Sequence, residues 1–270
     1  MFARSVSFIV PAAVCLLSLA KLNAQSKPGW PSVKTAPPDM ISVIDTRPLP
    51  AQSAPTIDVS RADRKRLEPD PADKARFREM LKDDSFGLVK LLNVDCGSDG
   101  PLVVHVGDCG DSIPGHGADF SFREGRHVFP AIADLKLNGG TLVVGSVMTQ
   151  GLLVTIGNVN IRAVDPSSNA MKFMTAFAPA PDIHGAEQQT LLLTKGFWNN
   201  GVFCRATAQV VEGQTYLLRT IAYRLRSDRG DKREDLVVVF TIVRQDSAGN
   251  VTFIWRRLQN RASPKISLEE

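Results

Sequence analysis

The fold is decided by two neighbouring runs, LVVVFTIV at Leu236–Val243 and VTFIWRRL at Val251–Leu258. Branched and aromatic side chains pack well on a pleated surface, so the first run predicts a central strand that is buried on both faces. The second run alternates apolar residues with Thr252, Ile254 and Arg256, which is typical of a half-exposed strand. Between them, the loop Gln245–Asn250 carries Gly and Asn, which tolerate positive φ. We therefore predict an antiparallel hairpin in the domain core.

Short apolar runs separated by turn residues continue this pattern upstream. Asn138–Gly140 and Gly157-Asn158 are further hairpin connections. The expected strands are Leu88–Val94, Leu102–Val106, Asp119–Arg123, Ala133–Leu137, Thr141–Met148, Leu152–Ile156, Val159–Val164, Met171–Ala178, Val202–Val210 and Thr215–Leu225. Many short strands at near-regular spacing predict a mainly β domain, an antiparallel β-sandwich or barrel-like fold over residues 88–262. The segment Ala186–Lys195 is compatible with a short helix.

One helix is expected before the strands, in a lead-in that spans residues 61–87. Asp70 can cap its N-terminus and Pro71 suits its first turn. Phe77, Met80 and Leu81 then form an apolar stripe at helical spacing, and Gly87 can end the helix.

The N-terminus has the layout of a secretory signal. Arg4 supplies a positive charge, Ser5–Ala20 is apolar, and Leu22–Ala24 offers a cleavage point, with Ser18–Ala20 as a second choice. We predict a signal peptide over residues 1–24 and a location outside the cytoplasm, either secreted or in the periplasm or cell envelope. An uncleaved anchor is the alternative. The mature chain is expected to contain no membrane-spanning segment.

Residues 25–60 hold seven prolines among Ser, Thr, Ala and Gln. Proline removes backbone donors and apolar residues are sparse, so this stretch cannot bury enough surface to order itself. We predict a disordered tether between the signal and the domain.

Export determines which cysteines remain in the mature chain and whether they can form a disulfide. Cys15 leaves with the signal, and Cys96 and Cys109 lie on either side of the expected strand Leu102–Val106. They form the candidate disulfide in an oxidising compartment. Cys204 sits in an apolar run, where a buried, inert thiol is expected, although it is also an alternative partner for either of the other two.

Several residues between positions 95 and 127 suggest chemistry, but none of them forms a catalytic pattern. A metal or calcium site would require residues from separate loops to converge, and Asp and Gly are also what turns require. We therefore predict no metal and no cofactor, and catalytic residues stay unknown. The candidates are Asp95, Asp99, His105, Asp108, Asp111, His116, Asp119 and His127.

The charge distribution indicates mainly which classes of binding partner to expect. Removal of residues 1–24 takes away Arg4 and Lys21, so the formal net charge of +4 becomes +2. A value this near neutral does not indicate nucleic acid as a partner. The segment Arg219–Lys265 holds eleven Lys or Arg against five Asp or Glu. It is either a solvated face or a basic surface for an anionic polymer.

Two stretches carry a family resemblance. The first is Asp119–Arg123, followed by Ala133–Leu135 and Gln150-Gly151; the second is Tyr216–Arg224 with Val237–Val243 and Trp255. Together they resemble a group of secreted, uncharacterised bacterial proteins over roughly residues 95–265. The resemblance implies an exported bacterial β domain and no particular activity.

These observations predict an exported binding or scaffolding module that is not an enzyme. Its partner is unknown, and an anionic envelope polymer or another envelope protein is the expected class. The alternative is an extracellular hydrolase that acts on a polymer with the Asp and His residues of the 95–127 loops. Such an enzyme would gather residues such as His105, Asp108, His116 and Asp119 around one cleft.

Overall fold

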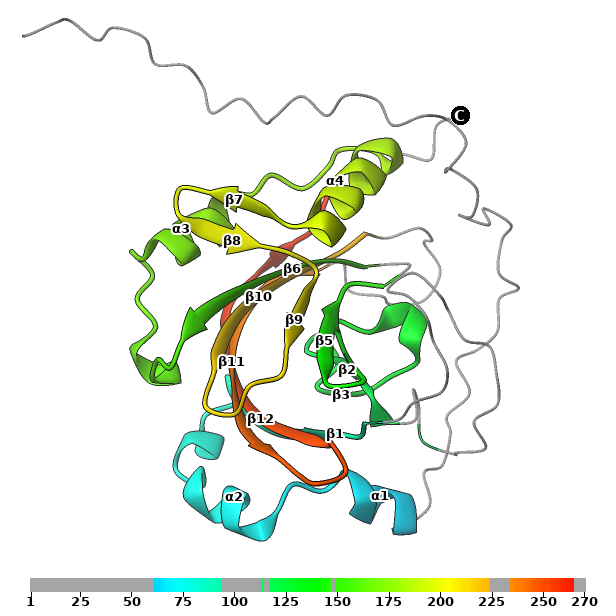
Figure 1. Cartoon of the computed structure of the whole chain (residues 1–270), viewed down its shortest axis with the longest axis vertical. Coiled ribbons are helices and arrows are strands. Elements are labelled where there is room, and N and C mark those ends of the chain that lie inside the picture. Colours follow the sequence, from blue (N-terminus) through cyan, green and yellow to red (C-terminus); the bar gives the residue numbers. More distant parts are fainter. Residues whose placement is uncertain (1–60, 94–112, 114–116, 147–148, 224–233, 265–270) are drawn as a thin grey trace, which may run out of the picture. The chain divides into compact units, whose positions relative to one another are not determined.

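Two antiparallel sheets form the body of the protein in the computed structural model (Figure 1). The structure describes residues 61–93, 113, 117–146, 149–223 and 234–264, which belong to one compact unit spanning residues 54–270. The predicted signal peptide, the tether and the strand Leu102–Val106 lie outside the described residues. No helix within the described ranges combines the length and apolar character needed to cross a bilayer.

The first sheet has five strands in the order β1-β12-β11-β10-β6. Every neighbouring pair in it is antiparallel. Its strands are β1 (Phe86–Leu91), β6 (Thr149–Gly157), β10 (Thr215–Ala222), β11 (Glu234–Gln245) and β12 (Val251–Ala262). The predicted hairpin is confirmed, because β11 pairs with β12 and lies in the middle of this sheet.

The second sheet also has five strands, in the order β3-β2-β4-β5-β9. They are β2 (Asp119–Ser121), β3 (Arg126–His127), β4 (Leu135–Asn138), β5 (Thr141–Val144) and β9 (Thr207–Gln209). A separate hairpin joins β7 (Phe197–Asn199) to β8 (Val202–Cys204). The prediction of a mainly β, antiparallel sandwich is thereby confirmed.

Aromatic side chains hold the two sheets together. From the second sheet and the turn that follows β2, Phe120 and Phe122 reach the inner face of the first sheet. The ring centroids of Phe120 and Phe253 lie 6.0 Å apart, and those of Phe122 and Trp255 lie 5.3 Å apart. Burial of such large rings contributes much of the stability of a core.

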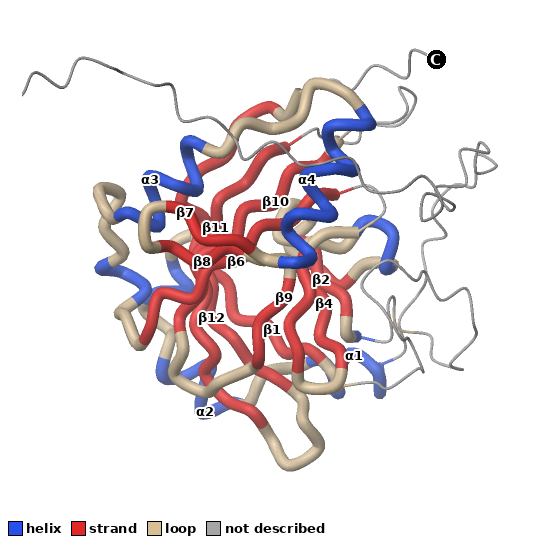
Figure 2. Tube along the Cα trace, turned by 45° about the horizontal axis from the view of Figure 1, so that its top comes forward, coloured by secondary structure: helices blue, strands red, loops and turns tan. Residues whose placement is uncertain are grey.

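The outer face of the first sheet is covered by helical segments, which Figure 2 shows in blue around the strands. They are α2 (Pro71–Arg76), η2 (Met80–Lys82), η5 (Ile161–Ala163) and α3 (Asn169–Ala176), whereas α1 (Arg61–Leu67) contacts β1 and lies beside Gly117. α4 (Ile183–Lys195) precedes the β7–β8 hairpin, and η4 (Pro130–Ile132) precedes β4. Because this face is covered, Ile254 is buried like its neighbours, and the expected half-exposed start of β12 is wrong.

The helical lead-in begins as predicted and ends earlier. The Asp70 carboxylate accepts a hydrogen bond from Ala72 N at 2.8 Å, so Asp70 caps α2. The helix stops at Arg76, well before Gly87. Gly87 lies instead in β1, where a Cβ would meet the Trp255 indole Nε1 at 2.4 Å. Glycine is needed there for a close approach, and not as the end of a helix.

Two segments predicted as strands are helical. Met171–Ala178 belongs largely to α3, whose Ser168 hydroxyl accepts a hydrogen bond from Met171 N at 3.3 Å. Val159–Val164 contains the short helix η5, capped by Asn160. In both segments the local cap overrides the strand preference of the apolar side chains, whereas the ambiguous segment Ala186–Lys195 is the main part of α4.

Candidate functional site

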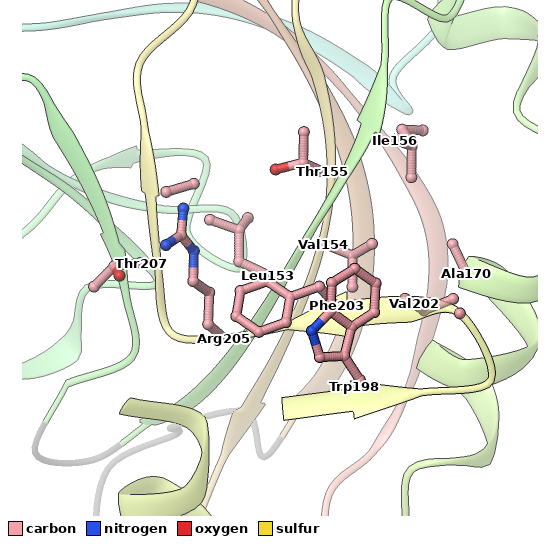
Figure 3. Close-up of a pocket in the computed structure, with 12 residues that line it drawn as sticks. Leu153, Val154, Thr155, Ile156, Ala170, Trp198, Val202, Phe203, Arg205 and Thr207 are labelled. Atoms are coloured by element: carbon pink, nitrogen blue, oxygen red, sulfur yellow. The ribbon is translucent and has the colours of Figure 1, made fainter. Parts of the chain in front are cut away.

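A hollow in the described residues lies beside the β7–β8 hairpin and has a volume of about 250 Å³ (Figure 3). We call it the hairpin cleft. Its lining comes from β6, α3, the hairpin and β9, and includes Thr155, Ala170, Trp198, Phe203 and Arg205. It opens where β6, an edge strand of the first sheet, and β9, an edge strand of the second, approach each other.

A tight turn builds the hairpin from local sequence. Asn200 and Gly201 connect β7 to β8 and have φ values of 48° and 78°. Positive φ at both central residues is characteristic of the turn whose twist matches that of paired strands, and Asn-Gly is its preferred sequence. Trp198 and Phe203 become direct cross-strand partners, with ring centroids 5.2 Å apart.

Neighbouring elements fix the positions of the hairpin rings. Phe197 packs against Phe173 of α3, with ring centroids 5.9 Å apart. At the end of α4, Gly196 has a φ of 75°, and a Cβ there would lie 2.7 Å from the Phe203 ring. The missing side chain of Gly196 therefore makes room for the ring of Phe203.

Trp198 itself is largely open to solvent, with an exposed fraction of 72%. One face of the indole rests on Phe203, and most of the ring surface is free. Burial of so little area contributes little to folding. An exposed tryptophan on a rigid support is instead typical of a binding surface.

Arg205 supplies the charge of the cleft. Its backbone is held by two hydrogen bonds to Leu153 of β6: Leu153 N donates to Arg205 O at 2.8 Å, and Arg205 N donates to Leu153 O at 3.1 Å. The guanidinium lies over the Phe203 ring, 5.7 Å from its centroid. In the view of Figure 3 the Arg205 side chain lies between those of Leu153 and Thr207. No carboxylate among the described residues forms an ion pair with it.

Most of the residues that the sequence suggested for chemistry lie outside the described residues. These are Cys96, Cys109, Asp95, Asp99, His105, Asp108, Asp111 and His116. The candidate disulfide and the cleft of the hydrolase alternative thus stay predictions. Among the residues that are described, no cluster of three or more His, Cys, Asp or Glu side chains is placed to hold a metal ion. Cys204 is buried and free, and burial raises the pKa of its thiol to about 12.

Asp119 and His127 are described, and they lie on neighbouring strands. His127 Nδ1 is 3.2 Å from the carbonyl oxygen of Asp119, to which it donates in one tautomer. Burial lowers the pKa of His127. Burial likewise raises the pKa of Asp119 to about 7, against a smaller opposing effect of Lys136. Within the described residues the Asp119 Oδ1 atom is buried without a hydrogen-bond partner.

We expect Asp119→Asn to stabilise the protein above neutral pH. The folded protein holds the Asp119 proton up to a higher pH than the unfolded chain, since its pKa of about 7 exceeds the ordinary 3.8. Stability from this group is therefore present below pH 4 and lost as pH rises toward 7. At pH 8 the neutral variant should unfold with a free energy higher by about 1–3 kcal/mol, because its amide costs less to bury than the charged carboxylate does.

Urea unfolding of the wild type and of Asp119→Asn at pH 4 and pH 8 measures this effect. The difference between the two proteins should be small at pH 4 and favour the variant at pH 8. His127 titrates in both proteins, so its contribution cancels in the difference. A variant that is less stable than the wild type at pH 8 would show that the Asp119 carboxylate is needed in its charged form.

Three of the described arginines in the basic C-terminal third are paired with carboxylates of the protein. Arg219 is fully buried and donates from Nε and Nη2 to the Asp235 carboxylate, both at 2.7 Å. Arg261 Nε donates to the same carboxylate at 2.6 Å. Arg244 pairs with Asp73 of α2 at 2.8 Å. Of these pairs, Arg219–Asp235 is buried, whereas the Arg244 and Arg261 side chains are partly exposed.

None of the patterns used above predicted the hairpin cleft. Asn200-Gly201 between Phe197-Trp198-Asn199 and Val202-Phe203 is a strong signal for a two-residue hairpin, and it would have placed Trp198 opposite Phe203. The contact between Arg205 and Leu153 joins positions 52 residues apart. No local pattern reveals it.

Comparison with protein-family models, with curated proteins and with solved structures found no match for this chain.

Proposed function

We propose that the protein is an exported, non-enzymatic binding module that holds a polysaccharide chain in the hairpin cleft. The observation that carries the proposal is the exposed Trp198 ring, 72% open to solvent and supported from behind by Phe203. The C–H face of a sugar ring carries small positive partial charges, and the face of an aromatic ring carries a negative quadrupole. A supported indole therefore offers a platform for a pyranose.

The polar groups around this platform suit the same ligand. Asn199 and Asn200 are exposed at the tip of the hairpin, and Thr155 lies exposed on the opposite side of the cleft. Amide and hydroxyl groups can both donate to and accept from sugar hydroxyls. An open groove of this kind admits an extended chain more readily than a small compact ligand.

The sequence supports the cellular setting of this proposal. The signal-like N-terminus favours export, and an exported module with a sugar-binding cleft would meet the polysaccharides of the envelope or its surroundings. An anionic envelope polymer, the partner class predicted from the sequence, would be a ligand of this kind.

Trp198→Ala should abolish most of the binding while leaving the fold intact. Loss of one stacking platform should weaken the affinity for an oligosaccharide by about tenfold or more, since aromatic anchors at the centre of a site dominate its binding energy. The unfolding free energy should fall by no more than about 1 kcal/mol, because little of the indole is buried. Isothermal titration calorimetry against a panel of neutral and acidic oligosaccharides measures the first effect, and urea unfolding measures the second.

Val211→Ala is the matched control, since Val211 is an exposed apolar residue, 50% open to solvent, that does not line the cleft. It should bind the panel as the wild type does. If the wild type bound no member of the panel, or if Trp198→Ala bound as tightly as the wild type, the proposed function would be wrong.

A further inference from the structure

We infer that the hairpin cleft selects sugars that carry a carboxylate, and that Arg205 is the residue that reads this charge. The inference rests on the proposed function and gives its ligand a chemical class, an acidic polysaccharide. It starts from the charge balance of the cleft. Arg205 lines the cleft, and no described carboxylate neutralises it.

The contrast with three arginines of the C-terminal third makes this feature informative. Arg219, Arg244 and Arg261 each form an ion pair with an aspartate whose own side chain is almost fully buried. A half-buried guanidinium has lost part of its hydration shell. When it has no carboxylate partner, no ion pair compensates for that loss. A ligand carboxylate would restore that interaction, and binding would then be favoured specifically for acidic ligands.

The geometry of Arg205 suits recognition of a planar group. Arg205 is restrained at both ends: its backbone is hydrogen-bonded to Leu153, and its guanidinium lies over the Phe203 ring. A restrained guanidinium loses less conformational freedom on binding and can donate two parallel hydrogen bonds to one carboxylate. Trp198 contacts the same Phe203 ring, with the two ring planes tilted by 44°. A sugar ring could therefore lie on Trp198 while the carboxylate of the same sugar, or of the next one in the chain, binds Arg205. The Phe203 ring would support both side chains.

A peptide with acidic side chains has the same charge, but it lacks the rigid C–H faces that suit the indole platform. The open cleft between two sheet edges also gives no sign of an enclosed pocket for a single side chain. The acidic sugar chain is therefore the occupant that uses both Trp198 and Arg205.

The test uses pairs of oligosaccharides that differ only in charge. Oligogalacturonate, oligomannuronate and hyaluronan oligosaccharides are each compared with the same chains after their carboxyl groups have been reduced to hydroxymethyl groups. Calorimetric titration of the full mature chain should show at least one acidic form binding about tenfold or more tighter than its reduced form. The preference should shrink as salt rises, because exposed charge interactions are screened.

Three variants assign the effect to residues. Arg205→Gln should lower the affinity for the acidic form to that for the reduced form, and should leave binding of the reduced form unchanged. Arg205→Lys should recover part of the preference, because it keeps the charge and loses the fork. Trp198→Ala should weaken both forms. Thermal unfolding of each variant checks that the fold is retained.

The outcomes separate the two proposals. Equal binding of acidic and reduced forms, or an undiminished preference in Arg205→Gln, would overturn the inference and leave polysaccharide binding in place. No binding of either form would overturn the proposed function as well. Poly-glutamate that bound as tightly as the best acidic sugar, and did so independently of Trp198, would show that the cleft takes acidic peptides.

Discussion

Replacing Asp235 with Asn should lower the free energy of unfolding by about 3–5 kcal/mol, the usual consequence of breaking a buried ion pair from one side. The Asp235 carboxylate is 1% exposed and accepts hydrogen bonds from Arg219 Nε, Arg219 Nη2 and Arg261 Nε. An asparagine amide would present an NH₂ donor where the guanidinium groups also donate. Arg219, which is 0% exposed, would keep its charge with no carboxylate to balance it.

The position of Arg219 explains why the cost should be large. Its Nη1 donates to the carbonyl oxygens of Met174 and Phe177, both at 2.6 Å, at the C-terminal end of α3. The Arg219–Asp235 pair thus joins α3 to the β10–β11 ladder. Loss of the carboxylate weakens the orientation of the guanidinium that holds this helix end.

Urea unfolding of Asp235→Asn and of Glu79→Gln provides the comparison. Glu79 pairs with Lys82 at 2.7 Å, and both side chains are more than half exposed. An exposed pair of this kind contributes about 0–1 kcal/mol, so its removal should have little effect. The double variant Arg219→Met with Asp235→Leu should be more stable than Asp235→Asn, because it leaves no fully buried charge unpaired; Arg261, whose side chain is 35% exposed, can still be hydrated. A small effect of Asp235→Asn would mean that water reaches this pair.

The strands that decide the fold could be predicted from the sequence because their signal is local. The apolar run of β11, the Gly249 turn and the run of β12 follow one another directly, and the structure pairs them. The order of strands across each sheet has no such local signal. In the first sheet β1 pairs with β12, which lies at the other end of the described chain.

The buried charges show where sequence analysis fails for a physical reason. Arg219 stands in a run of apolar residues, and its pairing with Asp235 depends on the β10–β11 register. A basic residue in a strand has no local feature that distinguishes a solvated position from a buried pair. The one available sign was that Leu217 and Leu218 precede Arg219, and that Ile221 and Ala222 follow it after Thr220.

The hairpin cleft was partly predictable. The Asn200-Gly201 turn and its aromatic neighbours were visible in the sequence, whereas their support by Gly196 and Leu153 depends on tertiary contacts. The exposure of Trp198 likewise depends on which elements pack beside the hairpin. The local sequence pattern therefore predicts the hairpin, whereas the support and exposure of the site residues depend on tertiary contacts.

Phe240→Ala should lower the free energy of unfolding by about 3–5 kcal/mol, the usual range for truncation of a buried aromatic residue. Phe240 is 0% exposed and lies in β11, the middle strand of the first sheet. Its ring contacts Tyr216 of β10 and Phe253 of β12, with centroids 5.1 and 5.5 Å apart. It also stacks on Phe122 from the facing layer at 6.3 Å. Alanine would leave a cavity between the two sheets that backbone pairing keeps from collapsing.

Arg256→Ala is the control from the neighbouring strand β12. Arg256 Nη1 donates to Arg162 O at 3.3 Å on the exposed side, and the guanidinium lies 5.6 Å from the Phe86 ring centroid. An exposed cation–π contact contributes about 0.5–1 kcal/mol, so the loss should stay near that value. Phe240→Leu should be milder than Phe240→Ala, because more of the volume is kept. If Arg256→Ala and Phe240→Ala instead lowered the free energy of unfolding equally, the aromatic layer between the sheets would contribute no more to stability than the contacts on the outer face of the first sheet.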